Sequence, residues 1–150
     1  MNKIATTIAA LLISTGVANA ASIDINTHNH ILTFHDDNGT VSTFKVATGS
    51  PVAAWHGTQV VSEKLVWPPW IPTASMRRKE PNLPAYVPGG PRSPLGARAL
   101  RLGHTNYLIH GTNAPGQIGR SVSHGCIRMY NKDAIYLYDH APIGTTVTVH

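Results

Sequence analysis

Apolar and polar residues alternate along the chain after residue 20, with the period of two that is typical of half-buried β-strands. Ile23, Ile25 and Ile31 each stand beside polar neighbours. The stretch Asp36-Asp37-Asn38-Gly39 then has the residues of a tight hairpin turn, and residues 41–46 have the pattern of the return strand. The pattern therefore predicts that the chain after residue 20 starts with antiparallel hairpins.

The same reasoning predicts strands at 59–66, 97–102, 106–110 and 145–149. Asn131 is a candidate N-cap for a short helix that carries Ala134, Leu137 and Tyr138 on its apolar side and stops before Pro142. Neither a repeat nor a linker divides the chain. We expect one mainly β domain, a β-sandwich or barrel of short strands, with one short helix near its C-terminus.

Residues 67–94 form a long segment rich in proline, tryptophan and basic side chains, including Arg77-Arg78-Lys79. Loops of this length in compact domains are usually functional or disordered. The aromatic residues favour an ordered loop. The basic run is interpreted as a solvated surface, with contact to an acidic polymer as the alternative.

The first twenty residues have the pattern of a signal peptide. Lys3 precedes an apolar run over residues 4–17, and Ala18-Asn19-Ala20 fits a signal-peptidase site. The run is shorter than the roughly 20 residues that span a bilayer. A membrane anchor and a buried first helix are the alternatives. We expect a cleaved leader at 1–20 and a periplasmic domain at 21–150, monomeric and without stable membrane insertion.

Composition supports a folded domain: 42% of the residues are apolar, 13% are charged, and 13 glycines and 11 prolines favour turns. Loss of Lys3 with the leader would lower the formal net charge from +5 to +4. A basic surface suits nucleic acid, anionic lipid or an acidic polymer. Export argues against nucleic acid and leaves the carboxylate-rich bacterial cell wall as the natural acidic partner. A charge of +4 is also what solubility alone would require, so the charge by itself does not identify a partner.

The only cysteine, Cys126, follows Ser123-His124-Gly125 and precedes Ile127-Arg128. A lone cysteine in an exported protein indicates either an intermolecular bridge or a reactive thiol. A small buried hydrophobic residue is the alternative. A nearby histidine, a flexible glycine and an arginine favour a nucleophile.

A thiol nucleophile needs a base, and both His110 and His124 are candidates. Composition does not choose between them. Gly125 allows a close backbone approach, so the amides of Gly125 and Cys126 are candidate oxyanion donors. Arg128 offers a planar fork for a carboxylate.

His110, the run Ser123-His124-Gly125-Cys126 and Arg128 together resemble the signature of the L,D-transpeptidase catalytic domain family. The resemblance extends over most of residues 21–150 and is weaker before Val60. One departure concerns Ala53–Thr58, which stands where family members usually carry a Thr-Pro-x-Gly loop.

The resemblance implies that Cys126 attacks a peptidoglycan tetrapeptide stem after the L-centre of diaminopimelate and releases D-Ala. His110 would be the base, with its ring held by the backbone carbonyl of Gly111. His124 would line the pocket and support its geometry, and Ser123 would contact substrate. Arg128 would contact a substrate carboxylate or fix the cysteine loop.

The resemblance further implies an acyltransferase of cell-wall biogenesis and cell shape that carbapenems inhibit. An amine on a second stem or on an envelope protein would resolve the thioester, and no metal or cofactor is implied. Two alternatives stay open. Water instead of an amine would make the enzyme an L,D-carboxypeptidase or an amidase. A non-enzymatic periplasmic protein would bind metal through His28, His30 and His35.

Two site residues also have structural interpretations. His110 is alternatively a hydrogen-bonded core histidine. Arg128 is alternatively the ion-pair partner of Asp133 or Asp139.

Overall fold

The computed structural model describes residues 19–150. Most of the predicted signal peptide lies outside these residues. The elements in chain order are β1 (Ser22–Asn26), β2 (Ile31–His35), β3 (Val41–Lys45), β4 (Thr48–Gly49), β5 (Gly57–Val66), α1 (Ala74–Lys79), β6 (Arg98–Leu102), β7 (Leu108–His110), a 3₁₀ turn (Pro115–Gln117), β8 (Ser121–Ser123), β9 (Ile127–Arg128), α2 (Asn131–His140) and β10 (Thr146–Val149).

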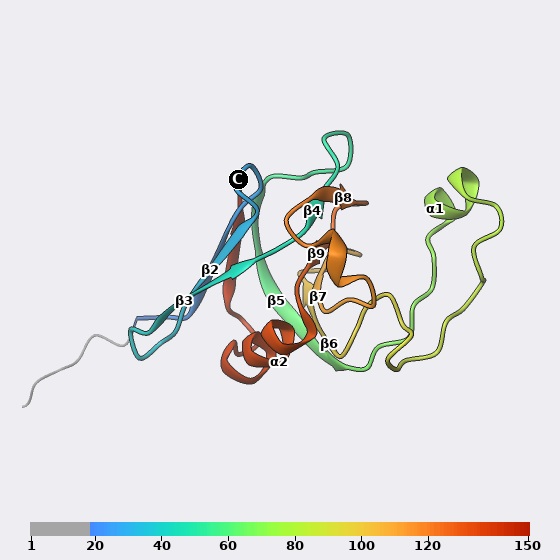
Figure 1. Ribbon diagram of the computed structural model, residues 1–150. Coiled ribbons are helices and arrows are strands. Elements are labelled where there is room, and N and C mark those ends of the chain that lie inside the picture. The colour runs from blue at the N-terminus through green and yellow to red at the C-terminus, as the bar shows by residue number, and fades with distance from the viewer. Residues whose placement is uncertain (1–18) are drawn as a thin grey trace, which may run out of the picture.

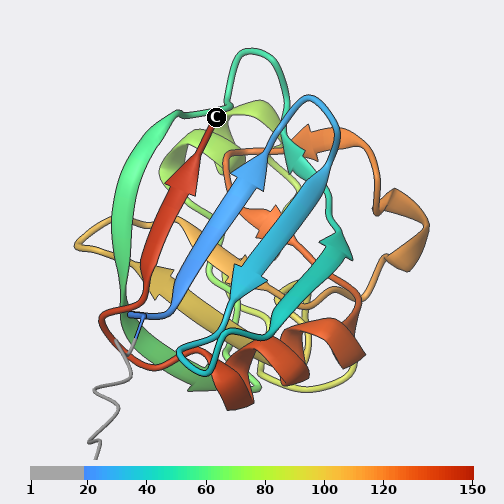
Figure 2. The ribbon, with the colours of Figure 1, turned by 90° about the vertical axis from the view of Figure 1, so that its left-hand side faces the viewer.

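Eight strands form one curled sheet in the order β3-β2-β1-β10-β5-β6-β7-β9, and β4 pairs with β8 in a second, two-stranded sheet (Figure 1). β10 pairs in parallel with β1 and antiparallel with β5. Figure 2 shows β3, β2, β1 and β10 side by side, with β5 curving away at the edge of this face. The predicted mainly β domain of short strands is confirmed.

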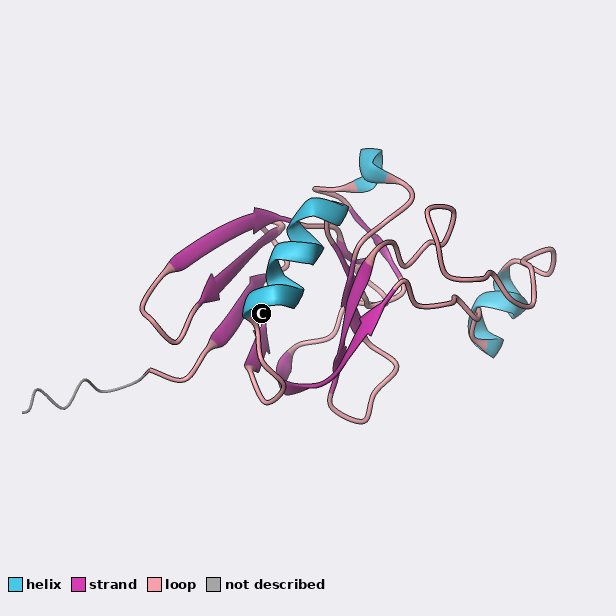
Figure 3. Cartoon of the chain, turned by 90° about the horizontal axis from the view of Figure 1, so that it is seen from below, coloured by secondary structure: helices cyan, strands magenta, loops and turns pink. Residues whose placement is uncertain are grey.

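Helix α2 lies between the two halves of the curled sheet, as Figure 3 shows from below. Its Leu137 is 1% exposed in the main core. Tyr136 packs on Phe44 of β3 with ring centroids 5.6 Å apart. On the other side, Lys64 of β5 lies over the ring of Tyr138. The helix therefore joins both halves of the sheet around one core.

The predicted helix near the C-terminus is confirmed, but the prediction that Asn131 is its N-cap is wrong. The N-cap is Tyr130, which makes no side-chain capping hydrogen bond, and Asn131 is the first helical residue. The side-chain amide of Asn131 instead forms hydrogen bonds with two other loops of the backbone. Its Oδ1 accepts from the backbone N–H groups of Ala97 (3.0 Å) and Thr112 (3.1 Å), and its Nδ2 donates to the Thr112 carbonyl (3.0 Å).

Residues 67–94 form an arm beside the sheet with α1 at its outer end (Figure 1). Trp70 and Val87 exchange two backbone hydrogen bonds of 2.9 Å, which tie the two sides of the arm together. Thr73 caps α1 by accepting from the Met76 N–H. None of the residues of α1 is buried, so this helix has no apolar face for a sequence pattern to reveal.

Candidate active site

His110 and Cys126 come together because β7 and β9 are adjacent parallel strands. The register pairs Ile109 with Ile127 and His110 with Arg128. Ile109 and Ile127 are each 1% exposed and point into the core. Side chains alternate along a strand, so His110 and Arg128 share the opposite face. Cys126 comes just before β9 and lies in the same cavity.

That cavity, of about 210 Å³, is lined by the predicted site residues His110, Ser123, His124, Cys126 and Arg128. Trp70, Met76, Glu80, Leu83, Pro94 and Leu95 complete its lining. The structure therefore brings together all five side chains that the sequence singled out.

Two further cavities, of about 400 and 420 Å³, also have Cys126 in their lining. Met76 of α1 lines all three cavities, so the arm forms part of each wall. Arg77 lines the second cavity and Lys79 the third. Cys126 is therefore approached from more than one side, with basic residues of α1 along two of the routes.

His110 is buried, with 3% of its surface exposed. Its Nδ1 lies 2.5 Å from the carbonyl oxygen of Gly111, the contact that the family resemblance implied. A carbonyl accepts only, so Nδ1 carries the proton and Nε2 is left as the basic nitrogen. Burial lowers the pKa of His110 to about 4, so the ring is neutral near pH 7.

The Cys126 thiol is half-buried, and its sulfur lies 3.8 Å from the carbonyl oxygen of Asn106. Burial raises the pKa of this thiol above its ordinary value, although a backbone hydrogen bond at Leu108 and the Arg128 cation act in the opposite direction. The resting site thus holds a neutral thiol and a neutral imidazole in the lining of one cavity. Such a pair reacts when the base removes the proton as the sulfur attacks.

The loop that carries Cys126 is a tight turn closed by Ser123. Ser123 Oγ donates to the Cys126 carbonyl (2.5 Å) and accepts from the Gly125 N–H (3.1 Å). Gly125 has φ +117°, a conformation that L side chains rarely adopt. The sequence predicted the amides of both Gly125 and Cys126 as oxyanion donors. The Gly125 N–H is already hydrogen-bonded to Ser123 within the turn, so it is not free for an oxyanion. The Cys126 amide remains the candidate donor.

Arg128 donates through Nη1 to Gln117 Oε1. Its backbone exchanges two hydrogen bonds with Ala47 (2.8 and 2.9 Å). Among residues 19–150, neither Asp133 nor Asp139 pairs with it, so the structural ion-pair interpretation is wrong. The guanidinium instead faces the cavity that holds Cys126.

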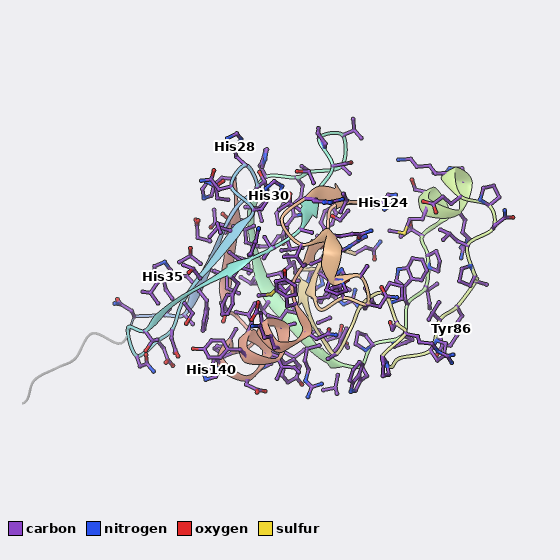
Figure 4. The ribbon with its side chains drawn as sticks, viewed as in Figure 1. His28, His30, His35, Tyr86, His124 and His140 are labelled. Atoms are coloured by element: carbon purple, nitrogen blue, oxygen red, sulfur yellow. The ribbon has the colours of Figure 1, made fainter. Side chains whose placement is uncertain are left out.

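His124 stands in the bend between β8 and β9 and lines two of the cavities at Cys126. Figure 4 shows its side chain pointing toward the arm. His110 is the buried histidine with a fixed tautomer, whereas His124 is half-exposed. The geometry favours His110 as the base.

The histidines considered for metal binding do not form one set. His28 and His30 lie in the turn between β1 and β2, whereas His35 is at the far end of β2 (Figure 4). His30 Nε2 contacts Ser121 Oγ at 2.8 Å. Within residues 19–150, no group of three or more histidine, cysteine or acidic residues is placed to hold a metal ion.

Several side chains of this site escaped sequence reasoning. Met76 and Glu80 reach the cavity only because the arm folds over it. Trp70, which precedes α1 in the arm, also lines the cavity. Asn131 fixes the backbone around Gly111 through the three hydrogen bonds described above. Nothing in the sequence signalled this role, because an asparagine at this position is typical of an N-cap.

Lowering the pH should destabilise the fold through His110. Its pKa is about 4 in the folded chain against an ordinary 6.5, so between these values the unfolded chain binds more protons. The free energy of unfolding should fall by roughly 3 kcal/mol across that window as the pH drops. Urea denaturation of wild type and His110→Gln, followed from neutral to acid pH, checks this. Parallel stability curves for the two proteins would contradict it.

No helix in residues 19–150 combines the length and the apolarity needed to cross a bilayer.

A family model described as the L,D-transpeptidase catalytic domain matches residues 20–149. Among curated proteins, the chain is 40% identical over 119 residues to the probable L,D-transpeptidase ErfK/SrfK of Escherichia coli K12, covering 75% of this chain and 38% of that protein. The Salmonella typhimurium protein of the same name is 48% identical over 93 residues, covering 59% of this chain and 30% of that protein. The chain therefore spans about a third of the length of these relatives.

Solved structures share the fold at low sequence identity. L,D-transpeptidase 3 from Mycobacterium tuberculosis superposes with a TM-score of 0.70 at 19% identity, covering 87% of this chain and 61% of the other. The L,D-transpeptidase LdtMt1, solved in complex with imipenem, gives a TM-score of 0.67 at 17% identity, covering 87% of this chain and 59% of the other.

Proposed function

The chain belongs to the L,D-transpeptidase catalytic domain family, and from this premise we propose that it is an exported cysteine transpeptidase that acts on peptidoglycan tetrapeptide stems. The observation that carries the proposal is the pairing of a buried, neutral His110 with the Cys126 thiol in one cavity. A base held neutral at physiological pH and a single thiol are the groups that acyl transfer requires.

In the first half-reaction, His110 Nε2 takes the proton of the thiol while the sulfur attacks the carbonyl carbon of the donor peptide. The negative charge that develops on the carbonyl oxygen is stabilised by the backbone N–H of Cys126. When the tetrahedral intermediate collapses, the C–N bond breaks and the D-Ala amine leaves with the proton from His110. A thioester on Cys126 remains.

In the second half-reaction, an amine on another stem or on an envelope protein attacks the thioester, and His110 accepts the amine proton. The C–S bond breaks and the thiol is restored. The several cavities at Cys126 support this two-substrate reaction, because donor and acceptor need separate approaches to the sulfur. Arg128 and the basic residues of α1 supply cations for the carboxylates of such stems.

The cellular setting is part of the same proposal. Residues 1–20 act as a cleaved leader, and residues 21–150 work as a monomer in the periplasm, in cell-wall biogenesis. The sequence pattern of the leader and the position of the family match, which begins at residue 20, support this division.

Incubation of the purified chain with a disaccharide-tetrapeptide, followed by mass spectrometry of protein and products, tests the function. We expect an acyl adduct on the protein, free D-Ala and crosslinked dimers. Tripeptides without dimers would assign the water-resolved carboxypeptidase reaction instead. If the tetrapeptide yields no adduct on the protein and no product, the proposal is overturned.

A further inference from the structure

Trp55 belongs to the segment Ala53–Thr58, which departs from the family pattern, and it contacts the loop that carries Cys126. Its indole Nε1 donates to the carbonyl oxygen of Gly125 at 3.1 Å. The two residues are 70 positions apart in the chain. The indole also stacks on Tyr107, with ring centroids 5.2 Å apart and planes 15° apart.

Tyr107 lies directly against Gly125. A Cβ atom at Gly125 would come within 2.4 Å of the Tyr107 ring, so ring and backbone are in close contact. Trp55 thus approaches the Gly125 peptide through its N–H group and also through the ring on which it stacks. Both aromatic side chains are half-buried against the main core, which limits their motion.

The segment that carries Trp55 is itself fixed to β8. The Ser50 N–H donates to the Ser123 carbonyl (2.9 Å), and the Ser50 carbonyl accepts from the N–H groups of Ala53 (2.8 Å) and Ala54 (2.7 Å). β4 pairs with β8 immediately before this turn. The indole therefore stands on a turn that is anchored to the same strand from which the Cys126 loop departs.

The consequence follows from the planarity of the peptide bond. No cis peptide is found in residues 19–150, so the carbonyl of Gly125 and the N–H of Cys126 point in opposite directions. A donor that fixes the carbonyl therefore also fixes the direction of the N–H. We propose that Trp55 is a positioning residue that orients the Cys126 N–H as the oxyanion donor. This inference rests on the proposed function of the site.

The test compares two reactions of the same sulfur. Acylation by imipenem passes through a tetrahedral intermediate with an oxyanion, whereas alkylation by iodoacetamide displaces iodide at a saturated carbon and forms none. Trp55→Phe keeps an aromatic ring to stack on Tyr107 but removes the indole N–H. We expect its imipenem acylation rate to fall about tenfold while its iodoacetamide alkylation rate stays at the wild-type value.

Trp67→Phe is the matched control, because Trp67 lines none of the three cavities at Cys126, and it should leave both rates unchanged. Equal loss of acylation and alkylation in Trp55→Phe would mean a general structural role and would overturn the inference, as would unchanged acylation. A wild-type chain that iodoacetamide alkylates but imipenem does not acylate would instead overturn the proposed function, and this inference with it.

Discussion

Replacement of Cys126 by alanine is expected to abolish acyl transfer, with a loss of turnover of about 10⁴-fold or more. The expectation follows from the chemistry of the site. Cys126 is the only thiol in the chain, and it lines the cavity of His110 as well as the two other cavities. Intact-protein mass spectrometry with the tetrapeptide should show an adduct on wild type and none on Cys126→Ala.

Cys126→Ser is the matched control for this measurement, because it keeps the size of the side chain and replaces the sulfur with a weaker nucleophile. Both variants should unfold near the wild-type temperature, since the site sits at the edge of a small satellite cluster rather than in the main core. Full turnover by Cys126→Ala would refute the thiol mechanism outright.

The second large effect is expected from His110. Loss of the general base in His110→Ala should lower kcat for acylation by about 10²-fold or more. Loss of the half-exposed His124 should cost less than about tenfold, because no proton transfer is lost with it. Stopped-flow measurement of imipenem acylation for both variants gives the comparison.

The alkylation rate of Cys126 by iodoacetamide provides a second readout for these histidines. If His110 deprotonates the thiol as proposed, His110→Ala should slow alkylation as well as acylation, in contrast to Trp55→Phe. A large effect of His124→Ala together with wild-type rates in His110→Ala would transfer the role of the base to His124.

Much of the fold was predictable because it depends on local patterns. Alternation of apolar and polar residues identified both strands of the β2–β3 hairpin, and the turn at Asp36–Gly39 indicated their pairing. Strands β8 and β9 were missed, since two or three residues are too few to show alternation. Helix α1 was missed because it has no buried face.

The candidate site likewise combines residues that the sequence pattern identified with contacts that only the folded structure shows. Cys126 and His110 were found from a motif, because reactive side chains are rare and their spacing is informative. The contacts of Trp55 and Asn131 were not predicted, since they are made to backbone carbonyls and amides that only the folded chain brings near these side chains. A sequence pattern shows which side chains do chemistry more readily than it shows which ones hold a peptide group in place.

The position of β10 in the middle of the sheet has a consequence for how the domain folds. In the order of the eight-stranded sheet, β10 is the strand that links β3, β2 and β1 to β5, β6, β7 and β9. Thr27 and His150 are hydrogen-bonded across 123 positions of the chain. Closing so large a loop has a high entropic cost and gives slow folding. When the N-terminal end of the chain emerges first, the sheet therefore cannot be completed until residues 146–149 are available. Until then the first hairpins leave apolar residues exposed.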